Sequence, residues 1–159
     1  MDITSRHHLR SDAVREAREH LEAHLGVTLE GEAFERVEFE DSDWEVVLVD
    51  GEPMIAYFDD EPFLTVRGAN ATDPDRRLVV VDAGAVSFVS DGADVMRPGI
   101  VDADEGITAG DLVLIAEEAH GKVLAVGRSR VDGTELLGEE GKVIDSLHHV
   151  GDELYGFSG

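Results

Sequence analysis

The stretch VDAGAVSFVSDGADVMRPGIV, Val81 to Val101, decides how the second half of the chain folds. Asp82 can cap a short helix over residues 83–90, and Gly92 lies where that helix should end. A new extended segment follows and leads into a Pro-Gly turn. The residue before that turn is Arg97, an unexpected base in a chain that has 36 acidic and only 13 basic residues.

Around this stretch, short β-branched runs alternate with turns that contain glycine. The predicted strands cover residues 78–81, 95–96, 111–117 and a segment from 122, and the tail after residue 141 supplies one or two more. Several strands joined in this way within about 80 residues are typical of a small barrel or sandwich. The helix over 83–90 is the only helix we expect in this half.

The first half of the chain reads as one helix followed by strands. Apolar residues at helical spacing predict a helix over residues 11–26, which Gly26 ends. Asp50-Gly51 predicts the turn of a hairpin between strands at 44–49 and 53–58.

Residues 68–77, GANATDPDRR, separate the two halves. This segment is polar and has no apolar periodicity, so it is predicted to be a connection rather than a helix or a strand. We therefore place a domain boundary inside it and expect domains at residues 1–74 and 75–159.

The net charge of −23 is the most unusual feature of the composition. The acidic residues are spread over both halves, and only two of the 13 bases are lysines. This pattern is typical of adaptation to molar salt, where the Debye length is only about 3 Å and self-repulsion is screened. An acidic protein that binds basic partners is the alternative. In a halophilic protein the net charge does not argue against RNA binding.

The composition also excludes several classes of site. The chain has no cysteine, so disulfides, thiolate metal sites and cysteine nucleophiles are excluded. It contains no apolar run long enough to cross a bilayer, and its first ten residues lack the apolar stretch of a signal peptide. We therefore expect a cytoplasmic protein without a membrane partner.

Four motifs in the second half resemble the PUA domain, an RNA-binding domain of pseudouridine synthases and archaeosine transglycosylases. They are D-x-G-A at 82–85, G-A-x-V-x-x-P-G-I at 92–100, G-D-x-V at 110–113 and A-V-G at 125–127. The first half is similar to the pre-PUA domain of translation-associated PUA proteins of archaea and eukaryotes. The resemblance implies an α+β chain with a small N-terminal α/β domain and a mainly β pseudo-barrel.

The resemblance also implies an RNA-binding surface made by the short helix and the strand after it. Carried over to this sequence, its residues are Gly92, Ala93, Asp94, Val95, Met96, Arg97, Pro98 and Gly99. The small residues would let an RNA backbone approach main-chain N–H groups, and Arg97 would hold a phosphate through two hydrogen bonds. The acid at position 94 fits such a surface if it accepts from a base amino group or pairs with Arg97.

Other basic residues can extend this surface. Arg128 and Arg130 alternate along a predicted strand and so face the same side, and Lys142 could continue the track. The alternative is scattered surface charge that offsets nearby acids. Arg77, at the start of the barrel, could touch RNA or simply link the domains.

The histidines are ambiguous by sequence. His20 and His24 lie four residues apart on the predicted helix, where they could share a metal or a solvated face. His148 and His149 should point to opposite sides of a strand and therefore do not form a chelating pair. We predict neither a metal site nor a cofactor.

These observations favour a non-catalytic RNA-binding protein that acts in translation on small-subunit ribosomal RNA or tRNA. The resemblance implies the small ribosomal subunit and a density-regulated-protein-like or initiation-factor-like protein as partners. Two alternatives remain open. One is an RNA-modification enzyme or its accessory protein, although residues 1–74 show no paired nucleophile, phosphate loop or metal-ligand set. The other is a small-molecule or peptide-binding module on a PUA-like barrel.

Overall fold

A computed structural model describes all residues, 1–159, and divides them into two compact units. The first unit comprises Met1–Pro74 together with Gly156–Gly159, and the second comprises Asp75–Tyr155. The last four residues thus group with the first unit, although residues 75–159 were expected to form the second domain. None of the helices combines the length and the apolar composition that a membrane span requires.

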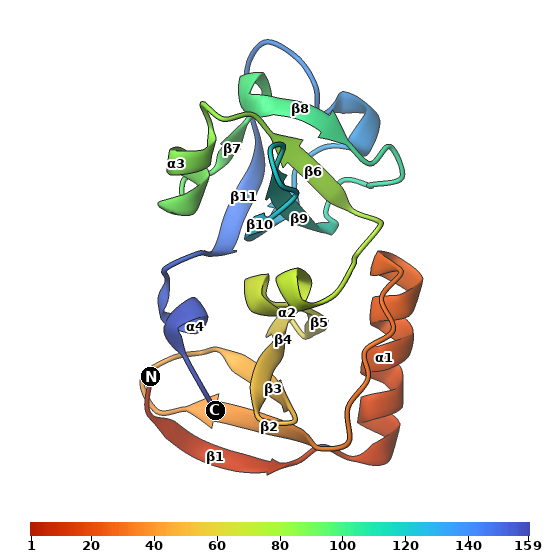
Figure 1. The fold of residues 1–159 in the computed structure, drawn as a ribbon, viewed down its shortest axis with the longest axis vertical. Helices are drawn as coiled ribbons and strands as arrows, with labels where there is room; N and C mark the ends of the chain where they lie inside the picture. The colour runs from red at the N-terminus through yellow and green to blue at the C-terminus, as the bar shows by residue number, and fades with distance from the viewer. The chain divides into compact units, whose positions relative to one another are not determined.

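The first unit is a five-stranded antiparallel sheet with two helices (Figure 1). Its elements are β1 (Ile3–His8), α1 (Ser11–Leu25), β2 (Phe34–Phe39), β3 (Glu45–Val49), β4 (Glu52–Phe58), β5 (Glu61–Leu64) and α2 (Val66–Ala71). The strands follow one another in the order β1-β2-β3-β4-β5. Helix α1 buries the stripe formed by Ala17, Leu21 and Leu25, so its apolar periodicity is what holds it on the core.

Two turns of the first unit lie where the sequence predicts them. Gly26 adopts a left-handed conformation, with φ of 70°, and ends α1 as predicted. Asp50 and Gly51 both have positive φ, at 50° and 87°, which is the geometry of a tight hairpin turn between β3 and β4.

Two elements of this unit were not expected. Strand β1 went unpredicted because five of its six residues are exposed, so it shows no apolar alternation. The predicted connection 68–77 is wrong over its first part, because residues up to Ala71 belong to α2. The Thr65 side chain caps that helix by accepting a hydrogen bond from the N–H of Gly68.

The second unit is built on a six-stranded sheet that forms the predicted β pseudo-barrel. Its elements are β6 (Leu78–Val81), α3 (Val86–Ser90), β7 (Val95–Met96), η1 (Arg97–Gly99), β8 (Ile100–Ala103), β9 (Leu112–Glu117), β10 (Val123–Ser129), η2 (Gly133–Glu135), β11 (Lys142–His149) and α4 (Glu153–Gly156), whose last residue belongs to the first unit. The strand order is β7-β11-β10-β9-β6-β8, in which only the β6–β9 pair is parallel. The fold class predicted from sequence is therefore confirmed.

An apolar cluster of buried residues forms a core of the second unit. It draws on nearly every strand and on α3, and includes Val79, Val89, Val95, Ile115 and Ile144. Close packing also explains Gly127 in the middle of β10. A Cβ there would lie 2.5 Å from the Ile144 side chain and 2.7 Å from the Asp145 carbonyl oxygen, so β10 and β11 approach closely only because this residue is glycine.

Candidate nucleic-acid interface

An apolar cavity of about 300 Å³ opens between α3 on one side and β7 and η1 on the other. Its lining residues are Asp82, Gly84, Ala85, Phe88, Val89, Asp94, Val95, Met96, Pro98 and Gly99. Gly99 brings the two walls together, since a Cβ at this position would lie 2.9 Å from the Cβ of Ala85. The cavity therefore contains five of the eight residues predicted for the RNA surface between Gly92 and Gly99.

Phe88 and Met96 flank this cavity and are unusually exposed for apolar side chains, at 67% and 47%. An exposed phenyl ring beside an apolar cavity is suited to stacking with an unpaired nucleobase. Phe88 was not among the residues predicted for the RNA surface. The sequence held a signal for this exposure, because Ala85, just before α3, and Val89 lie four residues apart and both pack against the core, whereas Phe88 is off that spacing.

Gly92 is required by packing within the unit. Its φ is 92°, and a Cβ there would lie 2.7 Å from Nε2 of His149. His149 is fixed in turn, because Nδ1 lies 3.0 Å from the Ser90 carbonyl oxygen and 2.9 Å from that of Val150, so this nitrogen must carry the donating hydrogen. Glycine at position 92, which was expected to allow the approach of RNA, thus makes room for the His149 imidazole.

Arg97 is turned toward the loop between η2 and β11. Its Nε donates to the Glu135 carbonyl oxygen at 2.9 Å, and its Nη1 donates to that of Glu140 at 3.0 Å. Two donors of the guanidinium are therefore already engaged, and the predicted two-bond phosphate grip would have to compete with them. The geometry gives Arg97 a structural role, which is to anchor this loop.

Asp94 forms two intramolecular contacts, neither of them with Arg97. It accepts a hydrogen bond from the backbone N–H of Ser146 at 2.8 Å and pairs with Nζ of Lys142 at 3.1 Å. The Ser146 hydrogen bond, helped by Lys142, holds the pKa of the Asp94 carboxyl below its usual value despite partial burial. The charge of Lys142 is accordingly compensated within the protein.

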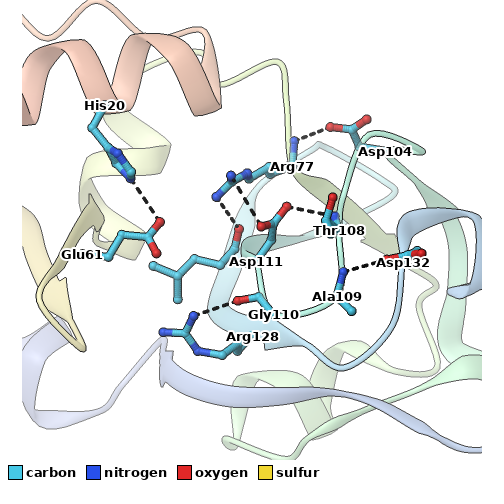
Figure 2. Close-up of polar contacts among 11 residues, drawn as sticks. His20, Glu61, Arg77, Asp104, Thr108, Ala109, Gly110, Asp111, Arg128 and Asp132 are labelled. Atoms are coloured by element: carbon cyan, nitrogen blue, oxygen red, sulfur yellow. Dashed lines mark hydrogen bonds and ion pairs between the residues drawn. The ribbon is translucent and has the colours of Figure 1, made fainter.

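The other two bases of the predicted track are also engaged. Arg128 donates from Nη1 to the Gly110 carbonyl oxygen at 2.8 Å (Figure 2). Arg130, one residue beyond the end of β10, forms two hydrogen bonds with Asp145, at 3.0 and 2.6 Å, and these hold the pKa of that carboxyl low. Each predicted cation thus has a partner inside the unit.

Arg77 belongs to a neighbouring polar network that shapes the loop before β9. Its backbone N–H donates to Asp104 at 2.6 Å, and its Nη2 lies 3.7 Å from a carboxylate oxygen of Asp111 (Figure 2). Only 13% of the Arg77 side chain is exposed, so little of it is accessible to RNA.

The histidines contact neighbouring carboxylates in both units. His148 is fully buried, and its Nδ1 lies 2.8 Å from Asp152, which also accepts from the N–H groups of His149 and Tyr155. Burial would raise the pKa of Asp152, but these hydrogen bonds together hold it below its usual value.

In the first unit, the ring centroids of His20 and His24 lie 4.3 Å apart, and Nε2 of His20 lies 3.1 Å from a carboxylate oxygen of Glu61 (Figure 2). No group of three or more histidine and acidic side chains is placed to hold a metal ion.

Comparisons with known proteins agree with this architecture. The family model described as the PUA domain matches residues 77–151. An uncharacterized protein of Methanocaldococcus jannaschii is 45% identical over 118 residues, which span 74% of this chain and 73% of that protein. The translation machinery-associated protein 20 of Saccharomyces cerevisiae is 32% identical over 117 residues, which span 69% of this chain and 65% of the yeast protein.

A solved structure extends the similarity to both units. A conserved PUA domain protein from Thermoplasma acidophilum superimposes with a TM-score of 0.82 at 28% sequence identity, covering 95% of this chain and 97% of its own. The motifs between Asp82 and Gly127 that predicted the fold lie inside the segment that the family model matches. On these grounds the chain belongs to the family of PUA-domain proteins.

Proposed function

We propose that this protein is a non-catalytic RNA-binding protein that acts in translation. The observation that carries the proposal is the exposed Phe88–Met96 pair beside an apolar cavity, inside the segment that matches the PUA domain. The similarity to translation machinery-associated protein 20 supports the cellular process.

The charges of the interface indicate how it would bind. Because Lys142 pairs with Asp94 and Arg130 pairs with Asp145, phosphates meet few uncompensated cations there. Binding would then depend mainly on base stacking and on hydrogen bonds to base edges. Stacking of a base on an aromatic side chain is worth about 1–3 kcal/mol. Unpaired bases at loops or ends of RNA are the substrates that such contacts suit.

The finer parts of the proposal concern target, partners and environment. The RNA is small-subunit ribosomal RNA or tRNA, the protein works on the small ribosomal subunit in the cytoplasm, and a density-regulated-protein-like or initiation-factor-like protein accompanies it. The net charge of −23 supports a halophilic setting, in which molar salt screens repulsion between the protein and RNA.

Crosslinking and sequencing of RNA bound to the tagged full chain in molar potassium chloride tests this function. The wild type should enrich small-subunit ribosomal RNA or tRNA, and Phe88→Ala should lose that enrichment. Ile3→Ala is a matched control, because Ile3 is an apolar side chain with 43% exposure outside the matched segment. Failure of the wild type to enrich any RNA would overturn the proposal.

The cavity also favours one second candidate, a module that binds a small apolar molecule or a peptide side chain. A volume of about 300 Å³ with mostly apolar lining lies at the lower end of the range of ligand pockets. Binding of small aromatic molecules in the absence of any RNA enrichment would favour this candidate.

A further inference from the structure

Strand β1 is an open edge of the first sheet. It pairs only with β2, and five of its six side chains are exposed. Backbone groups on an open edge can form the same hydrogen bonds with a strand from another molecule.

The register identifies the backbone groups that face outward. The N–H of Leu9 donates to the Phe34 carbonyl oxygen, and His7 lies opposite Arg36. In an antiparallel ladder only alternate residues bond to the partner strand, so His7 bonds inward to β2. Arg6 and His8 therefore direct their N–H and C=O groups away from the sheet.

This edge lacks most of the features that usually block strand addition. The sequence ITSRHH contains no proline, no lysine and no acid, and its only irregularity is a bulge between Ile3 and Ser5. The other sheet edges differ. Strand β5 carries Glu61, β8 carries Asp102, and β7 is only two residues long.

The charge around β1 indicates the chemistry of a partner. Residues 3–11 contain none of the 36 acids of this chain. Arg6 binds Glu35 through Nε and Nη2, at 3.0 and 3.1 Å, which leaves its Nη1 group for another acceptor. Arg6 and His8 project from the same face of β1, where the side chains of an added strand would lie beside them.

We propose that β1 is a docking edge for an extended segment of a partner protein that carries acidic side chains at alternate positions. Main-chain hydrogen bonds to Arg6 and His8 supply the attachment, and the acidic side chains lie beside the basic ones. A second copy of this chain fits less well, because antiparallel pairing of two β1 strands brings the Arg6 and His8 side chains of both copies together.

Amide hydrogen exchange of the full chain tests the proposal directly. The probe is a synthetic peptide of about ten residues that alternates valine and glutamate and is long enough to span β1. Binding should slow exchange at the amides of Arg6 and His8, while the amide of His7, which already bonds inward, changes little. The measurement belongs at the lowest salt concentration at which the protein stays folded, because salt weakens charge pairing.

Matched variants and peptides separate the main-chain and charge contributions. His8→Pro removes an outward N–H and should abolish binding, whereas His8→Ala keeps that N–H and should retain most of it. Replacing the glutamates of the peptide by lysine should weaken binding about tenfold, and Arg6→Glu should reverse that preference.

Four results would overturn the proposal. They are peptide binding that leaves exchange at Arg6 and His8 unchanged, equal affinity for both peptides, protection that rises with protein concentration alone, and protection caused by RNA instead of peptide. The third would indicate self-association through this edge, and the fourth would place RNA there.

Discussion

Replacing Gly92 by alanine should destabilise the second unit through two separate effects. The first is backbone strain, because a φ of 92° is unfavourable for any residue with a Cβ and costs about 1–2 kcal/mol. The second is a collision, because the new Cβ would lie 2.7 Å from Nε2 and 2.9 Å from Cδ2 of His149. Relieving such a contact costs about 1–3 kcal/mol. We expect a total loss of about 2–5 kcal/mol in the free energy of unfolding.

The structure supplies a control for the strain alone. Gly110 lies in the same unit with a φ of 95°, and no atom lies within 4 Å of its hypothetical Cβ. Gly110→Ala should therefore lose only about 1–2 kcal/mol. Urea denaturation of both variants, in the salt that stabilises the wild type best, measures the difference.

His149 can be tested as the group that Gly92 accommodates. In a double-mutant cycle, His149→Ala should remove the steric part of the Gly92→Ala loss but leave the strain. Two results would refute the packing explanation of Gly92. One is a Gly92→Ala variant that is no less stable than Gly110→Ala. The other is that the stability losses of Gly92→Ala and His149→Ala add in the double mutant.

Four further predictions concern other parts of the chain. Phe157→Ala should destabilise the first unit by about 3 kcal/mol and speed amide exchange in β2, because Phe157 is 9% exposed and its ring lies edge-on to that of Phe39, with 4.9 Å between the centroids. Unchanged amide exchange in β2 would contradict this prediction. Asp152 has a lowered pKa in the folded state, so its stabilising effect is complete above its unfolded-state pKa of about 4 and disappears as the pH falls through the folded-state pKa. In Asp152→Asn the free energy of unfolding should therefore fall less steeply with falling pH over this range, as measured by urea denaturation at several pH values. Arg97→Lys keeps the charge but not both carbonyl contacts, so proteolysis should become faster between Glu135 and Gly141, and an unchanged cleavage rate would argue against loop anchoring. RNA affinity should persist in molar potassium chloride with a shallow salt dependence, whereas a steep loss from about 0.1 M upward would contradict base-dominated binding.

Elements with strong local signals could be predicted from the sequence. The Asp50-Gly51 pair specifies its hairpin because both residues tolerate positive φ, and Gly26 ends α1 for the same reason. In the second half, the β-branched run Leu78–Val81 is observed as β6. These features depend on neighbouring residues, so one sequence is enough to identify them.

Contacts between distant residues could not be predicted. The carbonyl oxygens that bind Arg97 belong to residues 38 and 43 positions away, and the Asp94–Ser146 hydrogen bond spans 52 residues. The sequence therefore identified the segment that forms the candidate surface but not the partners of its side chains. Strand β1 was missed for a related reason, because it is defined by its pairing with β2 and not by an apolar pattern.

Crosslinks between the full chain and its bound RNA, mapped by mass spectrometry, would locate the RNA-binding surface. We expect crosslinked peptides from α3 through η1, with Phe88 and Met96 among the modified residues. Crosslinks confined to other segments, with this stretch unmodified, would contradict this expectation.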